Sequence, residues 1–149
     1  MVTMNTKGKR ILKIRKTIDK EWSQYYLKFI KENPMQNWNW YCISRNPNIT
    51  MDIIRDNPNK PWVWYDISSN PNITMDIIRD NPNKPWVWQS ISANPNITWE
   101  NIQDNPIQNW DWIYISKNTN ITYKIIIDNP TKPWNWNFIS INPNITMEI

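Results

Sequence analysis

The sequence repeats itself with a period of 24 residues. The string NPNITMDIIRDNPNKPWVW occurs twice without a change, at residues 46–64 and at residues 70–88. In the same register, Asn-Pro pairs begin at Asn33, Asn57, Asn81, Asn105 and Asn129, and Trp-x-Trp triplets begin at Trp38, Trp62, Trp86, Trp110 and Trp134. All twelve prolines and ten of the twelve tryptophans fall in this frame. A period of this length indicates a stack of small units, none of which can bury its apolar face alone.

Each 24-residue unit is predicted to form two short helices. After the turn NPNIT, Thr50 can cap a helix over residues 51–56. Asn59 or Lys60 can then open a second helix, with Pro61 at its first position, that ends before residue 70. Helices this short are not stable alone in water, so contacts between units must stabilise them. We therefore expect an all-α chain.

The residues that recur in every unit define the expected core. Trp64, Ile67 and Ser68 are three and four positions apart, so they share one face of the second helix. Trp62 points roughly the other way and should cover either the Asn-Pro corner of its own unit or a neighbouring unit. The predicted core consists of Trp40, Trp64, Trp88, Trp112, Trp136, Ile43, Ile67, Ile91, Ile115 and Ile139.

Other positions vary from unit to unit, which indicates contact with solvent. They are the residue between the two tryptophans and the residue that follows the second one. Such positions can carry specificity for a partner without disturbing the core. The candidate partner surface consists of Asn39, Val63, Val87, Asp111, Asn135, Tyr65 and Gln89.

The repeated tryptophans and acids have structural explanations. A buried tryptophan removes about 150–250 Å² from water, so several can stabilise a chain that has only two leucines. The alternative is a row of rings that stacks on bases or sugars. The acids Asp56, Asp80, Asp104 and Asp128 recur in the same way, and we expect them to accept hydrogen bonds from the N–H groups that open the next helix.

The segment NPNITMDIIRDNPNKPWVWYDI, at residues 46–67, resembles the leucine-rich repeat variant, a family of 24-residue helical repeats with Asn-Pro turns. In that family a short α-helix alternates with a 3-10 helix. The resemblance covers roughly residues 27–149 and implies a right-handed solenoid of short helix pairs. It would hold about five repeats, at residues 33–56, 57–80, 81–104, 105–128 and a truncated 129–149. Isoleucine in place of leucine and the Trp-x-Trp triplet depart from the family, and its cysteine cluster is absent, so no iron–sulfur cofactor is implied.

The composition suggests where such a chain originates. It has 24 Asn and 26 Ile but one Gly and one Ala, a bias that AT-rich codons produce. Repeats rich in Asn, Ile and Trp also resemble repeat proteins of mimivirus-like giant viruses. That resemblance implies no activity.

Positive charge is concentrated at the start of the chain. Residues 1–32 hold nine Lys or Arg against three Asp or Glu, whereas residues 33–149 hold eight against ten. We divide the chain into a basic arm, residues 1–16, and a single repeat domain, residues 17–149, whose first helix (17–32) caps the repeats. The arm is a candidate for binding nucleic acid, and the alternative is a solvated tail. The basic residues in question are Lys7, Lys9, Arg10, Lys13, Arg15 and Lys16.

The last unit, NPNITMEI, stops at Ile149 inside its first helix. Repeat stacks need a polar cap at each end to stay soluble. We therefore expect either a longer array or self-association through this uncapped end.

The residue types argue against an enzyme. The chain has no histidine, a single glycine and a single cysteine, Cys42, at a position that changes from unit to unit. We expect no metal or cofactor. The favoured function is a non-catalytic scaffold for protein–protein interaction. The alternative is binding of nucleic acid through the basic arm and exposed aromatic side chains, although the repeats themselves are slightly acidic.

Nothing in the sequence predicts a membrane span or a secretion signal, since no apolar run is long enough. Five Asn-Ile-Thr triplets begin at Asn48, Asn72, Asn96, Asn120 and Asn144, and in a secreted protein they would accept glycans. We interpret each as a turn followed by a capping threonine. The expected location is inside the cell, as a soluble protein without a membrane partner, in the host cytoplasm or the virion if the protein is viral.

Overall fold

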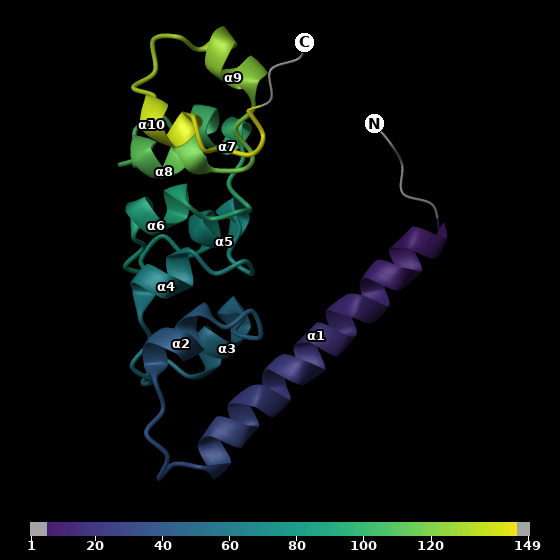
Figure 1. Ribbon diagram of the computed structural model, residues 1–149. Helices are drawn as coiled ribbons and strands as arrows, with labels where there is room; N and C mark the ends of the chain where they lie inside the picture. Colours follow the sequence, from purple (N-terminus) through teal and green to yellow (C-terminus); the bar gives the residue numbers. More distant parts are fainter. Residues whose placement is uncertain (1–5, 146–149) are drawn as a thin grey trace.

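The computed structural model describes residues 6–145, with side chains at residues 17, 18 and 21–145. All regular secondary structure in this part of the chain is helical and none of it is strand, so the predicted all-α class is confirmed there. A long helix, α1 (Thr6–Glu32), precedes a stack of short ones (Figure 1). These are α2 (Trp40–Arg45), α3 (Met51–Asp56), α4 (Trp64–Ser68), α5 (Met75–Asp80), α6 (Trp88–Ser92), α7 (Trp99–Asp104), α8 (Trp112–Lys117), α9 (Tyr123–Asp128) and α10 (Trp136–Ile139).

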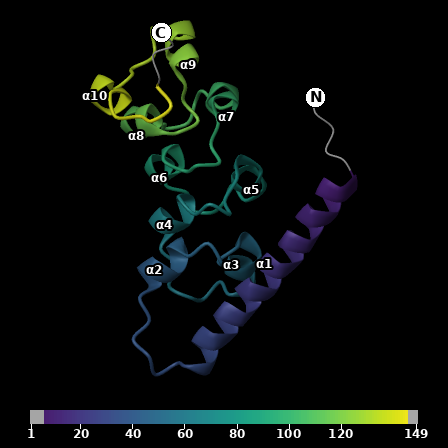
Figure 2. The same cartoon turned by 45° about the vertical axis from the view of Figure 1, so that its right-hand side comes forward.

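Helix α1 is longer than the predicted capping helix. It begins at Thr6 rather than at residue 17, so it includes most of the predicted basic arm. The reason is that residues 6–32 contain no proline and no asparagine, and a single glycine costs a helix only about 1 kcal/mol. The second half of α1 lies beside α3, and its first half extends away from the stack (Figures 1 and 2).

The helices α3, α5, α7 and α9 begin and end where the sequence predicts. The Thr50 hydroxyl accepts the N–H of Ile53 at the start of α3, and equivalent threonines cap the other three. At the end of α3, the Asn57 side chain donates to the carbonyl of Ile53 at 2.9 Å. A side-chain amide thus satisfies a carbonyl that would otherwise lack a partner at the helix end.

The even-numbered helices begin later than predicted. Helix α4 starts at Trp64 with Val63 as its N-cap, and Pro61 lies in the segment before it rather than at its first position. The cause is a contact from outside the unit. The Val63 N–H donates to the Ser44 hydroxyl at 2.9 Å, which holds Val63 in an extended conformation. The same bond recurs between Val87 and Ser68, Asp111 and Ser92, and Asn135 and Ser116.

Buried asparagines connect each unit to the one before it. The Asn94 side chain is fully buried, and its Nδ2 donates to the carbonyls of Ser68 at 3.0 Å and Asn70 at 3.1 Å. Its Oδ1 accepts the N–H of Asn96 at 2.9 Å. Asn70, one unit before, and Asn118 and Asn142, one and two units after, make the corresponding bonds. We call Asn70, Asn94, Asn118 and Asn142 the asparagine ladder.

A second series of asparagines reinforces these contacts. The Asn96 side chain donates to the carbonyls of Pro71 at 2.5 Å and Ile73 at 3.2 Å in the preceding unit. Asn72 and Asn120 do the same. The side-chain amides of these Asn-Ile-Thr triplets are therefore used within the fold.

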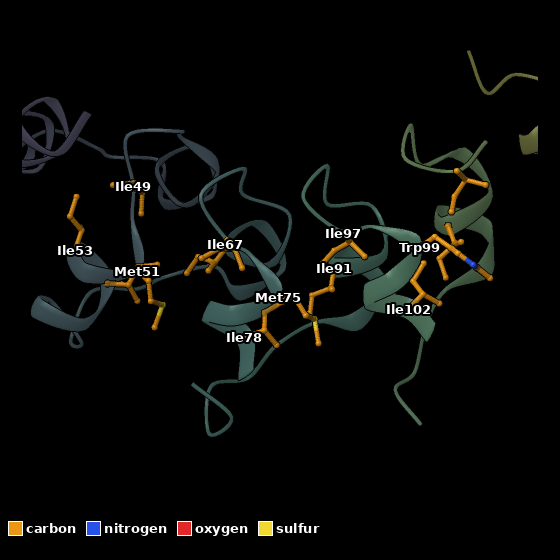
Figure 3. Packing of buried hydrophobic residues seen from close by; sticks show 14 of the residues in the cluster. Ile49, Met51, Ile53, Ile67, Met75, Ile78, Ile91, Ile97, Trp99 and Ile102 are labelled. Carbon is orange, nitrogen blue, oxygen red and sulfur yellow. The ribbon is translucent and has the colours of Figure 1, made fainter. Parts of the chain in front are cut away.

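The apolar core runs along the stack. Successive even-numbered helices contact each other, from α2 with α4 to α8 with α10. Ile67, Ile91 and Ile115 lie on them with no exposed surface, and isoleucines of the Asn-Pro turns, such as Ile73 and Ile97, are equally buried. Figure 3 shows Ile67, Ile91 and Ile97 among the buried side chains that follow one another along the stack.

The second tryptophan of each triplet is less buried than predicted. Trp40, Trp64, Trp88 and Trp112 pack against the core but keep part of their surface exposed, and Trp136 is 64% exposed. The first tryptophan of the next unit covers each of the four partly exposed ones, but not Trp136. No residue in the described part of the chain covers Trp136 in this way.

Loss of a single side-chain amide from the asparagine ladder should lower the stability of the fold strongly. Asn94→Ala removes the amide that donates to the carbonyls of Ser68, Asn70 and Ile73, and it should lower the free energy of unfolding by about 2–4 kcal/mol. Urea denaturation followed by tryptophan fluorescence measures this. Asn83→Ala, at an exposed turn position, is the matched control and should change stability little. Equal effects of the two substitutions would contradict the role assigned to the ladder.

Candidate interaction surface

The tryptophan pairs are contacts between units. The Trp62 ring meets the Trp40 ring of the preceding unit edge to face, with centroids 5.2 Å apart, and its Nε1 donates to the Asn57 carbonyl at 2.8 Å. Trp62 therefore covers both its own Asn-Pro corner and the neighbouring unit. The Lys60 ammonium lies 6.0 Å from the centroid of Trp40. These rings are engaged within the chain, which leaves less of them to stack on a ligand.

The repeated acids do not have the capping role that the sequence suggests. Asp56, Asp80, Asp104 and Asp128 are exposed, and within residues 21–145 none of them accepts an N–H from the helix that follows. Asp128 instead pairs with Lys124 of its own helix at 3.0 Å. The residue between the tryptophans takes the capping position, because it is the last extended residue before each even-numbered helix.

That position is consequently less exposed than predicted. Val63, Val87, Asp111 and Asn135 are half-buried, and only Asn39 is exposed. Asn39, Asp111 and Asn135 use their side chains to cap α2, α8 and α10. Of the candidate partner surface, these five positions are largely committed to the fold.

The residue after the second tryptophan is the exposed one. Tyr65 and Gln89 face solvent at the same place in α4 and α6, and Tyr41, Ile113 and Asn137 take this place in α2, α8 and α10. We call these five residues the outer row. The Gln89 side chain donates to the Asp111 carboxylate of the next unit at 3.3 Å. A hydrogen bond with the Tyr114 side chain of α8 raises the pKa of Tyr65.

The next position along these helices holds two buried polar groups that the sequence did not reveal. Asp66 and Ser90 are each 2% exposed, and among the described residues the Asp66 Oδ2 and the Ser90 Oγ are the buried side-chain atoms without a hydrogen-bond partner. Desolvation raises the pKa of Asp66, and the charge of Arg45 opposes that rise. The equivalent residues in the other units are Cys42, Tyr114 and Phe138, which have unrelated side chains. The sequence therefore gives no sign that this position is buried or polar.

Aromatic side chains of α1 form a second exposed surface. Trp22, Tyr25 and Phe29 are 64%, 67% and 57% exposed, whereas Leu27 and Ile30 on the other side are buried. The sequence places the aromatics near one side of a capping helix but does not show that the repeats leave them uncovered. Their spacing of three and four residues is the signal that identifies the surface.

The candidate nucleic-acid residues Lys7, Lys9, Arg10, Lys13, Arg15 and Lys16 fall within α1. Their side chains lie outside the part that the structure describes. Across residues 21–145, positive side chains are spread singly along the stack and several pair with acids, such as Arg55 with Asp52.

No group of acids and cysteine that could hold a metal ion occurs among the described residues, and Cys42 is exposed with a free thiol. None of the helices described is long and apolar enough to cross a membrane. No protein-family model, curated protein or solved structure matches the chain.

Asp66 should make stability depend on pH. Its carboxyl titrates near pH 4 in the unfolded chain and higher in the folded one. The folded chain therefore binds more protons between those two pKa values, so stability falls as pH rises through this window. Asp66→Asn should raise Tm at pH 7 by about 2–6 °C.

Thermal unfolding from pH 3.5 to 8 tests this expectation. The advantage of Asp66→Asn should shrink as the pH is lowered, because wild-type Asp66 then takes up a proton itself. Asp104→Asn, at an exposed carboxylate, serves as the control and should leave Tm unchanged. An advantage that does not vary with pH would rule out charge burial as its cause.

Proposed function

We propose that the chain is a non-catalytic scaffold that binds a protein partner. In this proposal the units form a right-handed solenoid of about five 24-residue repeats, akin to the leucine-rich repeat variant. The support is that equivalent residues make equivalent bonds 24 residues apart, as Asn94 does to Asn70 and Asn118 to Asn94. Such a stack presents one side chain per unit at a regular interval.

The observation that carries the proposal is the outer row. Its members lie at one register position on contacting helices, they are exposed, and they differ in chemistry from Tyr65 to Gln89 to Ile113. Exposed aromatic and aliphatic groups of this kind can anchor a protein interface, and polar neighbours supply hydrogen bonds. The isoleucines and asparagines that recur in the interior of each unit leave these positions free to differ.

Location and origin form part of the same proposal. We place the protein inside a cell or a virion, in keeping with its AT-rich composition and its resemblance to repeats of giant viruses. The inter-unit bonds of Asn72, Asn96 and Asn120 support this location. A glycan on Nδ2 would displace these bonds, so the triplets act as structural turns rather than as glycan acceptors.

Nucleic-acid binding is the second candidate. The feature that favours it is the excess of six positive charges over residues 1–32, on a chain segment that also carries exposed aromatic side chains. Positive charge neutralises phosphates and aromatic rings stack on bases. The repeats, with eight basic against ten acidic residues, are near neutral and do not extend this excess of positive charge.

The scaffold proposal is tested by changing the outer row alone. A Tyr65→Ser, Gln89→Ser, Ile113→Ser variant should keep the helical circular dichroism of the wild type, because these side chains are exposed. Affinity capture from cell extract, with proteins identified by mass spectrometry, should recover a partner with the wild type and at least tenfold less with the variant. The control Asp56→Ser, Asp80→Ser, Asp104→Ser changes three exposed side chains elsewhere and should capture normally.

Two results would contradict the proposal. The first is equal capture of every partner by the wild type and the outer-row variant. The second is recovery of nucleic acid in place of protein, with binding that falls as salt is raised, which would favour the second candidate.

A further inference from the structure

The exposed face of α1 is an apolar stripe with regular spacing. Ile18, Trp22, Tyr25 and Phe29 are 45%, 64%, 67% and 57% exposed. Their separations of four, three and four residues are those of a heptad seam, the pattern by which one helix packs along another. We call these four residues the α1 stripe.

The repeats leave most of this stripe exposed. Helix α1 meets the first unit through a different side, where Ser23, Leu27 and Ile30 are buried. Phe29 touches the Trp38 ring edge to face at 5.7 Å but stays largely exposed.

Charges beside the stripe match a second copy of the same helix. Glu21 and Lys28 are seven residues apart, so both flank the stripe on the same edge. When two copies run antiparallel, with Trp22 opposite the second copy's Tyr25, Glu21 of each helix lies near Lys28 of the other. In a parallel pair Glu21 would meet Tyr26, which carries no charge. Charge complementarity therefore favours the antiparallel arrangement.

Lys28 is available for this contact. Its ammonium lies 3.6 Å from Glu32 one turn along, but both side chains are more than half exposed, at 66% and 60%. An exposed pair of this kind contributes little to stability, so Lys28 can exchange or share its partner.

We propose that the α1 stripe is a dimerisation surface, on which α1 of a second copy packs antiparallel. The four side chains of each copy would together bury roughly 1,000 Å², near the lower limit for a specific interface. A reversible dimer of about micromolar affinity fits an area of this size. This surface is separate from the outer row, so the proposal does not depend on the scaffold function.

The test uses the full chain in sedimentation velocity across concentrations up to about 0.5 mM. The wild type should form a reversible dimer, and Trp22→Gln with Tyr25→Gln should weaken its Kd at least tenfold without loss of helical circular dichroism. Glu21→Lys should weaken dimerisation several-fold, because it places like charges across the interface, and Lys28→Glu should do the same. An equimolar mixture of these two single variants should regain wild-type affinity, since opposite charges then face each other at both positions.

Lys124→Glu is the matched control, because it breaks a similar exposed pair, with Asp128, on α9. It should dimerise as the wild type does. A chain that stays monomeric at 0.5 mM, or a dimer that tolerates Trp22→Gln with Tyr25→Gln, would overturn the proposal. Failure of the mixed variants to recover would refute the antiparallel arrangement. A monomer that binds vesicles of anionic lipid through Trp22 would show that the stripe has a different occupant.

Discussion

A carboxamide offers an oxygen that accepts hydrogen bonds and a nitrogen that donates two, and the stack depends on placing this group in its interior. Asn70 and Asn94 use all of these sites, since Oδ1 orders the turn of their own unit and Nδ2 binds carbonyls of the unit before. A buried polar group is costly when unpaired and specifies one arrangement when fully paired. Aspartate lacks the donors, so asparagine is the residue that the arrangement requires.

This division between interior and surface explains the character of the sequence. Three kinds of contact fix the position of each unit against the preceding one. They are the packing of the buried isoleucines, the asparagine ladder, and the serine hydroxyls that accept the N–H groups of Val63 and Val87. Side chains such as Tyr65 and Gln89 then vary without cost to the fold. Helix α1 differs from the units because its two faces have different uses, one packed on the first unit and one left open to solvent.

Local signals made part of the fold predictable. Thr50 caps α3 and Asn57 ends it because both act on residues within four positions. The start of α4 could not be predicted, because the N–H that holds Val63 extended binds a hydroxyl 19 residues earlier in the chain. The asparagine ladder could not be predicted either, because its bonds also join residues far apart in the sequence, whereas an Asn-Pro pair indicates only a local turn. Of the predicted surface, Tyr65 and Gln89 are exposed, whereas capping draws Asp111 and Asn135 into the fold.

The most direct test of this account is hydrogen exchange of the asparagine side-chain amides, resolved by NMR. If Asn94 and Asn118 hold the units together, their Nδ2 protons should exchange slowly, at rates that follow unfolding of the stack. Asn83 and Asn109, which are exposed, should exchange at the rate of a free amide. Rapid exchange of Asn94 and Asn118 in the folded protein would show that the ladder does not hold the stack together.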